Sequence, residues 1–449
     1  MLEKRTLLIK NGIVLTMNDS MEIIENGAVY IENDVIIEVG KTELICSKYD
    51  VAYKVIDAKG QVIMPGLVNL HNHTSVGQEL LSNMPMEDKM ALDWYPSVRA
   101  LNPEEAYILA LRAYGANIRT GITTTNDLYV QMLSSADAAE KIGIRATLAC
   151  EIVDDYKDDI KIVNTIEDNI KLFEKANGRA NGRIQVMFGL DWVPMSTTGQ
   201  LKEIPMVAKE YQARIHLHLN ESEGEVEYSL DKWGLRPTEL LYDFGVLDCN
   251  CVAAHCVRLS DREIAILGET NTAVSHNPSS NAILGNGIAR VPEMIQNHIT
   301  VGIGNDGQEQ DLFRVMEMAA IVQRGSRLNP TLSPESDIVR MATVEGAKAL
   351  NTNAGTLEKG KKADIIIIDM SDERFTGILL GENSNIYNYL VHVVNGQDVI
   401  TSIIDGEVVM ENRMLTKVDL QEILRQAKPA FEGVLSKINI PVYHYESQR

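Results

Sequence analysis

The segment PGLVNLHNHTSV (residues 65–76) decides the fold of this chain. A short apolar run ends there in two histidines one residue apart, His71 and His73. Side chains two positions apart on a strand share a face, so both imidazoles point the same way and Asn72 points the other way. Such a pair is either a satisfied buried polar pair or two ligands of a metal ion. The rest of the sequence has to decide between them.

Similar short apolar runs recur through the middle of the chain, separated by helix-like stretches such as NPEEAYILALRAYGANIRT. The eight runs are GLVNLHNH, GITTTNDLY, IRATLACEI, IQVMFGLDW, ARIHLHLNE, CVAAHCV, TAVSHNP and TVGIGNDG. Continuous apolar strands between helices indicate a parallel sheet that helices cover. Eight such units predict a TIM (β/α)8 barrel.

The two ends of the chain differ from this middle. Strand-like runs with turn signals fill the beginning (TLLIKNGIVLTM, GAVYIENDVIIEVG) and return near the end (KADIIIIDM, VITSIIDGEVVMENRML), with Asp405-Gly406 as a hairpin signal. We therefore expect a small β-sandwich domain built from both chain termini. The expected division is residues 1–60 for its N-terminal part, 61–354 for the catalytic barrel, and 355–449 for its C-terminal part with a terminal helix.

Composition narrows the class of protein. The 449 residues carry 42 Lys plus Arg against 63 Asp plus Glu, a formal charge of −21, which disfavours a nucleic-acid partner. No apolar run is long enough for a membrane span, and the start of the chain lacks the pattern of a signal peptide. The odd number of cysteines, five, argues against a disulfide framework. We expect a cytoplasmic homo-oligomer, a dimer or tetramer, that acts on a small molecule and binds no membrane.

Polar side chains gather where the predicted barrel strands end, which is where TIM barrels carry their chemistry. His71 and His73 end the first strand, and the later ones end in the residues His218 (fifth), His255 (sixth), His276 (seventh) and Asp306 (eighth). His216 shares a face with His218 but lies deeper, so we interpret it as a buried core histidine. Scattered histidines would not segregate in this way, and the metal interpretation of the first pair is therefore favoured.

Imidazoles with one carboxylate suit zinc or another first-row divalent ion. The predicted ligands are His71, His73, His218 and Asp306. The fourth strand contains no lysine that could bridge a second ion, so we expect one divalent metal ion, with zinc favoured and iron, manganese and nickel as alternatives. Glu221 follows His218 by three residues and is the candidate general base. The alternative for Glu221 is an ordinary solvated acidic loop.

Five motifs together resemble the amidohydrolase superfamily, and within it the branch of S-adenosylhomocysteine/methylthioadenosine deaminases and triazine (chloro)hydrolases. They are PGLVNLHNHTSVGQELL, HLHLNESEGEVE, AAHCVRLS, SHNPSSNAILGNGIARVPEM and GIGNDG. The resemblance implies a metal-bearing barrel with a split β-sandwich, and hydrolysis, often deamination, of N-heteroaromatic rings. It assigns proton transfer to Glu221, orientation of the attacking hydroxide to His255, and a structural or substrate-side role to His276.

Two positions depart from the adenosine-processing relatives. Trp192 stands where those relatives carry a histidine, and Val98 stands where they carry a ribose-binding glutamate. The sequence therefore predicts a hydrolytic deaminase that prefers free heteroaromatic amines of purine, pterin, pyrimidine or triazine type over their ribosides. Trp94 and Trp192, with Tyr95, are the candidate stacking wall for such a ring.

Three alternatives remain open at this point. The first is a deaminase of 5′-modified adenosines such as S-adenosylhomocysteine or methylthioadenosine. The second is a chlorohydrolase or amidase of the same fold, because the metal apparatus would be the same and only the pocket would differ. The third is a metal-free scaffold protein, which would require missing ligands.

Overall fold

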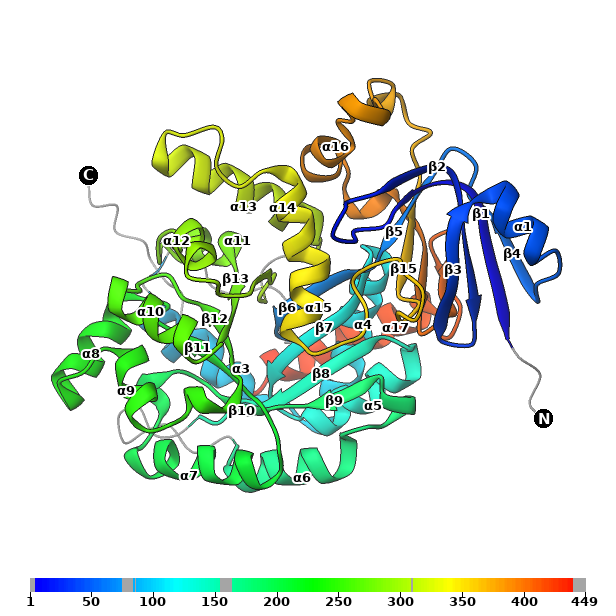
Figure 1. The fold of residues 1–449 in the computed structure, drawn as a ribbon. Helices are drawn as coiled ribbons and strands as arrows, with labels where there is room; N and C mark the ends of the chain where they lie inside the picture. The colour runs from blue at the N-terminus through cyan, green and yellow to red at the C-terminus, as the bar shows by residue number, and fades with distance from the viewer. Residues whose placement is uncertain (1–4, 75–83, 85, 154–163, 308–309, 439–449) are drawn as a thin grey trace.

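The fold was analysed in a computed structural model, which describes residues 5–74, 84, 86–153, 164–307 and 310–438 (Figure 1). Two parts are evident: a β-sheet region built from the chain's two ends, and a larger region in which strands alternate with helices. No helix among the described residues combines the length and the apolar character that crossing a bilayer requires.

The first part is a nine-stranded sheet in the order β18-β17-β16-β15-β5-β1-β2-β3, with β4 paired to β1. Its strands are β1 (Thr6–Leu15), β2 (Ile23–Glu32), β3 (Val35–Lys41), β4 (Lys54–Asp57), β5 (Val62–Pro65), β15 (Ile365–Ile368), β16 (Val399–Ile404), β17 (Glu407–Glu411) and β18 (Met414–Leu415). The two chain ends meet where β15 runs antiparallel to β5. The sheet from both termini is thus as expected, and it includes β5; the domain boundaries after residues 60 and 354 stay predictions.

The predicted hairpin at Asp405-Gly406 joins β16 to β17. Both residues have positive φ, 54° and 68°, as the tight turns that match strand twist require. A Cβ atom at Gly406 would lie 1.8 Å from the carbonyl oxygen of Asn33, so a side chain has no room there.

The second part contains the eight predicted barrel strands. They are β6 (Leu67–Asn72), β7 (Ile122–Tyr129), β8 (Arg145–Cys150), β9 (Ile184–Val186) with β10 (Phe188–Leu190), β11 (Ile215–Leu219), β12 (Val252–His255), β13 (Ala273–His276) and β14 (Val301–Ile303). Neighbouring strands pair in parallel as β6-β7-β8-β9 and as β10-β11-β12-β13-β14. Only Met187 separates β9 from β10, and its amide donates to the carbonyl of Leu148 (2.9 Å), so the two form one strand position.

The last strand position returns to the first. A parallel bridge joins Asn72 to Asp306, and the amide of Asp306 donates to the carbonyl of His71 (3.0 Å). This contact places the last strand position beside the first, as a TIM barrel requires, and it lies at the end of β6 that carries the two histidines.

Helices follow the barrel strands and cover them (Figure 1). They are α4 (Pro103–Arg119), α5 (Met132–Ile142), α6 (Ile166–Ala176), α7 (Thr198–Glu210), α8 (Glu223–Trp233), α9 (Pro237–Asp243), α10 (Asp261–Glu269), α11 (Pro278–Ile283), α12 (Val291–Gln296), α13 (Leu312–Arg327), α14 (Glu335–Arg340) and α15 (Gly346–Ala349). The longest, α4, begins where Asn102 and Glu105 form a capping box around Pro103. The remaining helices are α1 (Thr42–Lys48), α2 (Met86–Lys89), α3 (Tyr95–Ala100), α16 (Ile386–His392) and α17 (Leu420–Leu435), the last of which packs against α4.

A buried ion network joins the barrel to the terminal sheet. Arg145, at the start of β8, donates from Nε to Asp364 (2.6 Å) and from a terminal nitrogen to Asp405 (2.9 Å). All three side chains are less than a tenth exposed. The guanidinium therefore ties the first residue of a barrel strand to two segments of the C-terminal part of the sheet.

Candidate active site

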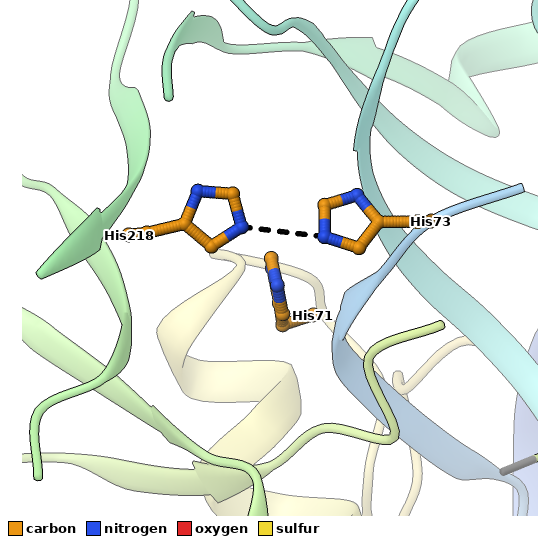
Figure 2. A group of neighbouring side chains, drawn as sticks. All are labelled: His71, His73 and His218. Atoms are coloured by element: carbon orange, nitrogen blue, oxygen red, sulfur yellow. Dashed lines mark hydrogen bonds between the residues drawn. The ribbon is translucent and has the colours of Figure 1, made fainter. Parts of the chain in front are cut away.

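Three histidines from two barrel strands face one another (Figure 2). His71 and His73 lie at the end of β6, and His218 lies near the end of β11. The Nε2 atoms of His73 and His218 are 3.2 Å apart, and the His71 ring stands nearly perpendicular to both. The prediction that His71 and His73 share the barrel-facing side agrees with this arrangement.

Asp306 completes the cluster from the segment after β14. Its Oδ1 lies 3.1 Å from Nε2 of His73 and 3.6 Å from Nε2 of His71. Its backbone has a φ of 60°, a left-handed conformation that is uncommon outside glycine and that turns the carboxylate toward the histidines. Every sequence-predicted metal ligand is therefore in one cluster.

The donor set fits a divalent metal ion. Nε2 of His71 is fully buried and has no hydrogen-bond partner within the described part of the chain. The three imidazole nitrogens and one carboxylate oxygen supply the ligand types that zinc prefers. A metal-free scaffold protein would not need this set intact.

Hydrogen bonds on the far side of each ring fix which nitrogen faces the cluster. Nδ1 of His218 donates to the carbonyl of Asp191 (2.9 Å), and Nδ1 of His73 donates to the carbonyl of Leu128. Nδ1 of His71 is 3.0 Å from Nε2 of His216. His216 is thus the buried, hydrogen-bonded histidine that the sequence predicted, and it also orients His71. Such outer partners are the usual support of metal-binding imidazoles.

The electrostatics of the cluster favour a positive charge at its centre. Burial, followed by the neighbouring histidines, holds the pKa of His71 well below its usual range, so this ring is neutral. Burial works against ionisation of Asp306, but its hydrogen bond to His73 and the surrounding imidazoles keep the pKa well below the usual value. Burial also disfavours charge on His218, yet the adjacent Asp191 raises its pKa to about 10.

Glu221 and His255 lie beside the cluster, as predicted. Oε1 of Glu221 accepts a hydrogen bond from Asn286 (2.9 Å) and is 3.6 Å from Nδ1 of His255. Nε2 of His255 lies 3.9 Å from Oδ2 of Asp306. Burial is the main cause that raises the pKa of Glu221 to about 8. The side chain is 5% exposed, so the alternative of a solvated acidic loop does not apply to this residue.

His255 is held in an unusual conformation. Its φ is 72°, and its Nδ1 contacts Oδ1 of Asn281 at 2.8 Å. Burial lowers its pKa to about 4, which leaves the ring neutral near pH 7. Because Nδ1 of the neutral ring donates to Asn281, Nε2 presents a lone pair and can accept one hydrogen bond.

One cavity is lined by Glu221 and His255 and by three members of the cluster, His73, His218 and Asp306. Its walls include the aromatic and sulfur-bearing side chains of Met86, Met90, Trp94 and Trp192. The ring of Trp94 packs edge-on against His73, with centroids 4.9 Å apart. Tyr95 is not part of the wall: it lies behind, where its hydroxyl donates to Asp191 (2.8 Å) and accepts from Trp192 Nε1 (3.2 Å). That Trp94 and Trp192 touch substrate stays a prediction.

Two other expected pocket residues lie elsewhere. His276 lines a different cavity, with Asn281 and Pro278, and is not among the described residues that line the active-site cavity. Val98 is buried in the core of the barrel layer and is not one of them either. The interpretation of Val98 as a wall facing a ribose was therefore wrong about its surroundings, because α3 turns this side chain inward.

The sequence reasoning missed two acidic residues of the cavity wall, Glu151 and Asp191. Each directly follows a barrel strand: Glu151 comes after β8, and Asp191 comes after β10. The rule that identified the metal ligands, polar side chains at strand ends, also applies to them. Burial, followed by the charge of Asp191, raises the pKa of Glu151 well above its usual value.

Comparisons with known proteins agree with this geometry. A profile of the Amidohydrolase family matches residues 62–409. The chain is 38% identical over 435 residues to a 5′-deoxyadenosine deaminase of Methanobrevibacter smithii, covering 95% of this chain and 98% of the relative. It is 35% identical over 440 residues to a 5-methylthioadenosine/S-adenosylhomocysteine deaminase of Acetivibrio thermocellus, covering 96% and 99%. A crystal structure of a Xanthomonas campestris adenosine deaminase with bound zinc superposes with a TM-score of 0.89 at 23% identity, covering 96% and 98%.

Proposed function

The chain belongs to the amidohydrolase family and is a metal-dependent hydrolase, and we propose that it removes ammonia hydrolytically from an N-heteroaromatic amine. The observation that carries this proposal is the cluster of His71, His73, His218 and Asp306, which lies beside Glu221 at one cavity. We propose these four residues as the ligands of one divalent ion, with zinc favoured. When bound, such an ion supplies Lewis acidity that makes water nucleophilic near neutral pH.

The chain's own residues supply positioning and proton transfer. Glu221 is placed to take a proton from the attacking water and to deliver it to a ring nitrogen, so that charge does not build up on the ring. His255 and Asp306 are placed to hold the attacking oxygen. The balanced reaction consumes the amine and one water, and it releases ammonia and the corresponding oxo-heterocycle.

The cavity wall supports a flat substrate. Trp94 and Trp192 offer aromatic surface, and Met86 and Met90 offer adaptable apolar surface beside it. A ring stacked there would bring its amino-bearing carbon to the metal side of the cavity.

We propose a purine amine as the substrate. The relatives that are 35–38% identical are named as deaminases of 5′-deoxyadenosine or of methylthioadenosine and S-adenosylhomocysteine, and these compounds share the adenine ring. The preference for free rings over ribosides rested on Val98 and Trp192. Val98 does not line the cavity, whereas two buried carboxylates do. We therefore propose both ribosides and free purines as substrates.

The test is ammonia release by the purified, metal-analysed protein. 5′-Deoxyadenosine, methylthioadenosine, S-adenosylhomocysteine, adenosine, adenine and guanine would each be assayed for ammonia and for the matching oxo product. Turnover of at least one purine is expected. Absence of ammonia from all of them, with metal fully bound, would overturn the proposal.

A cytoplasmic location, a homodimeric or homotetrameric state, and the lack of nucleic-acid and membrane partners remain proposals. The net charge of −21 supports the absence of a nucleic-acid partner, because such a surface repels phosphate backbones. Light scattering of the purified protein measures its oligomeric state directly.

A further inference from the structure

Glu151 is a buried acid without a visible task in the reaction described above. It follows β8, is 0% exposed, and lines the cavity that holds the metal-ligand cluster. Neither of its carboxylate oxygens has a hydrogen-bond partner in the described part of the chain. Leaving a buried polar group unsatisfied costs free energy, so such a group in a native structure calls for an explanation, such as a bound partner.

Asp191 lies beside it but is already engaged. Ligand-type atoms of Glu151, Asp191 and His218 all lie within 4.8 Å of one another. Oδ2 of Asp191 accepts from the hydroxyl of Tyr95 (2.8 Å), and Oδ1 is 3.3 Å from Nδ1 of His218. Asp191 is thus held in place by Tyr95 and His218. Burial and the neighbouring Asp191 carboxyl raise the pKa of Glu151, whose side chain lines the cavity.

A second metal ion does not fit this group. Nδ1 of His218 donates its proton to the carbonyl of Asp191, so this nitrogen has no lone pair to offer. Only two carboxylates remain, which is fewer than the three protein ligands typical of zinc sites. Carboxylate oxygens that face a substrate cavity are instead acceptors for N–H or O–H donors of the ligand.

We propose that Glu151, held next to Asp191, is a specificity-determining acceptor that binds two adjacent hydrogen-bond donors of the substrate other than its leaving amino group. The proposal rests on the proposed deaminase function for the identity of the ring. Two sources of adjacent donors fit a purine substrate: the vicinal hydroxyls of a riboside, and a second amino group on the ring. Two neighbouring acids disfavour an anionic group at this place, so the donor-bearing part of the substrate is neutral or cationic.

The test is a cycle of enzyme and substrate changes. Glu151→Gln keeps the shape of the side chain and replaces one acceptor oxygen by a donor. The riboside arm compares 5′-deoxyadenosine with 2′,3′,5′-trideoxyadenosine, and the ring arm compares 2,6-diaminopurine with adenine. The value of kcat/KM is measured for all four compounds, and calorimetry measures the affinity of each for the same proteins. Glu203→Gln, on the exposed face of α7, is the matched control.

If the proposal holds, Glu151→Gln lowers kcat/KM for the donor-bearing compound of one arm by roughly 10- to 100-fold, the scale of leaving a buried hydrogen-bonding group without its partner. For the partner compound without those donors, kcat/KM should change less than about threefold, because no hydrogen bond to Glu151 is lost. The arm that shows the difference identifies the source of the donors. Equal losses within both arms, or no loss in either, would overturn the proposal.

Failure of the proposed deaminase function can be distinguished from failure of the Glu151 proposal. If the deaminase function is wrong, the wild-type protein releases no ammonia from any of the four compounds. Calorimetry would still report whether a compound with the donor pair binds more tightly than its partner, and whether Glu151→Gln removes the difference. Metal content of the variant is measured in parallel, because a loss of metal would change all four compounds together and would count against a role in specificity.

Discussion

The Nε2 atoms of His73 and His218 lie 3.2 Å apart, and each ring donates its Nδ1 proton to a main-chain carbonyl. In neutral rings with that tautomer, both Nε2 atoms present lone pairs to each other. Two lone pairs at this distance repel unless a proton or a cation lies between them. The hydrogen bonds on the outer side of the rings therefore prepare the inner side for a positively charged ligand.

The first prediction concerns the metal. His71→Ala and His218→Ala should each lose most of the bound divalent ion, because each removes one of four predicted ligands. Elemental analysis of the purified proteins measures the metal-to-protein ratio, which should be about one ion per wild-type chain. His298→Ala, at an exposed position after α12, is the matched control. Full occupancy in both ligand variants would show that the ion binds elsewhere.

The second prediction separates metal binding from proton transfer. Glu221→Gln should keep its metal, while kcat falls by roughly 10² or more, the scale of general acid–base catalysis. Glu223→Gln is the control, because Glu223 lies two residues further on and its side chain is 61% exposed. Near-normal turnover of Glu221→Gln combined with a large loss in Glu223→Gln would move the proton shuttle to Glu223.

The third prediction concerns the support of His71. His216→Leu removes the 3.0 Å contact to Nδ1 of His71 without opening a large cavity. Metal affinity should fall roughly 10- to 100-fold, as for other outer partners of ligand histidines. Competition with a chelator measures this affinity. His276→Leu changes an equally buried histidine outside the cluster and should leave the affinity unchanged; equal losses in both variants would indicate a general packing effect instead.

The fourth prediction concerns the junction of barrel and sheet. Arg145→Met leaves Asp364 and Asp405 buried without their shared cation, and it should lower the free energy of unfolding by about 3–5 kcal/mol. Arg179→Met removes a partly exposed arginine that pairs with Asp137 and Glu140, and it should cost less than about 1 kcal/mol. Urea unfolding of the metal-loaded proteins compares the two. If both variants lost similar amounts of unfolding free energy, burial of the Arg145 network would add nothing to stability.

Local patterns in the sequence were sufficient to predict the barrel strands and the meeting of His71, His73, His218 and Asp306. Alternation of apolar runs with helices specifies each unit, and the position of His218 at a strand end places it with His71 because parallel strands end at one rim. The orientation of α3 was different. Whether Val98 faces the cavity depends on how this six-residue helix is turned against the barrel, and so short a helix has no periodic pattern that reports it.

Glu151 and Asp191 were missed for another reason. Each is a single acidic residue after a strand, and single acids at strand ends are common in solvated loops. Their significance depends on burial and on the lack of partners for Glu151, which are properties of the assembled cavity. The two histidine pairs were easier to recognise because imidazoles are rarer and because two residues on one face repeat the signal.

The bridge between Asn72 and Asp306 has a consequence for biosynthesis. The first two predicted ligands leave the ribosome early, but the carboxylate that completes the set is on the segment that brings the last strand position back to the first. At about 5–20 residues per second, the emerging chain spends on the order of ten seconds or more with its histidines exposed before that bridge can form. Tight metal uptake therefore reports that the barrel has been completed, and a nascent chain that stops before Asp306 should bind the ion weakly.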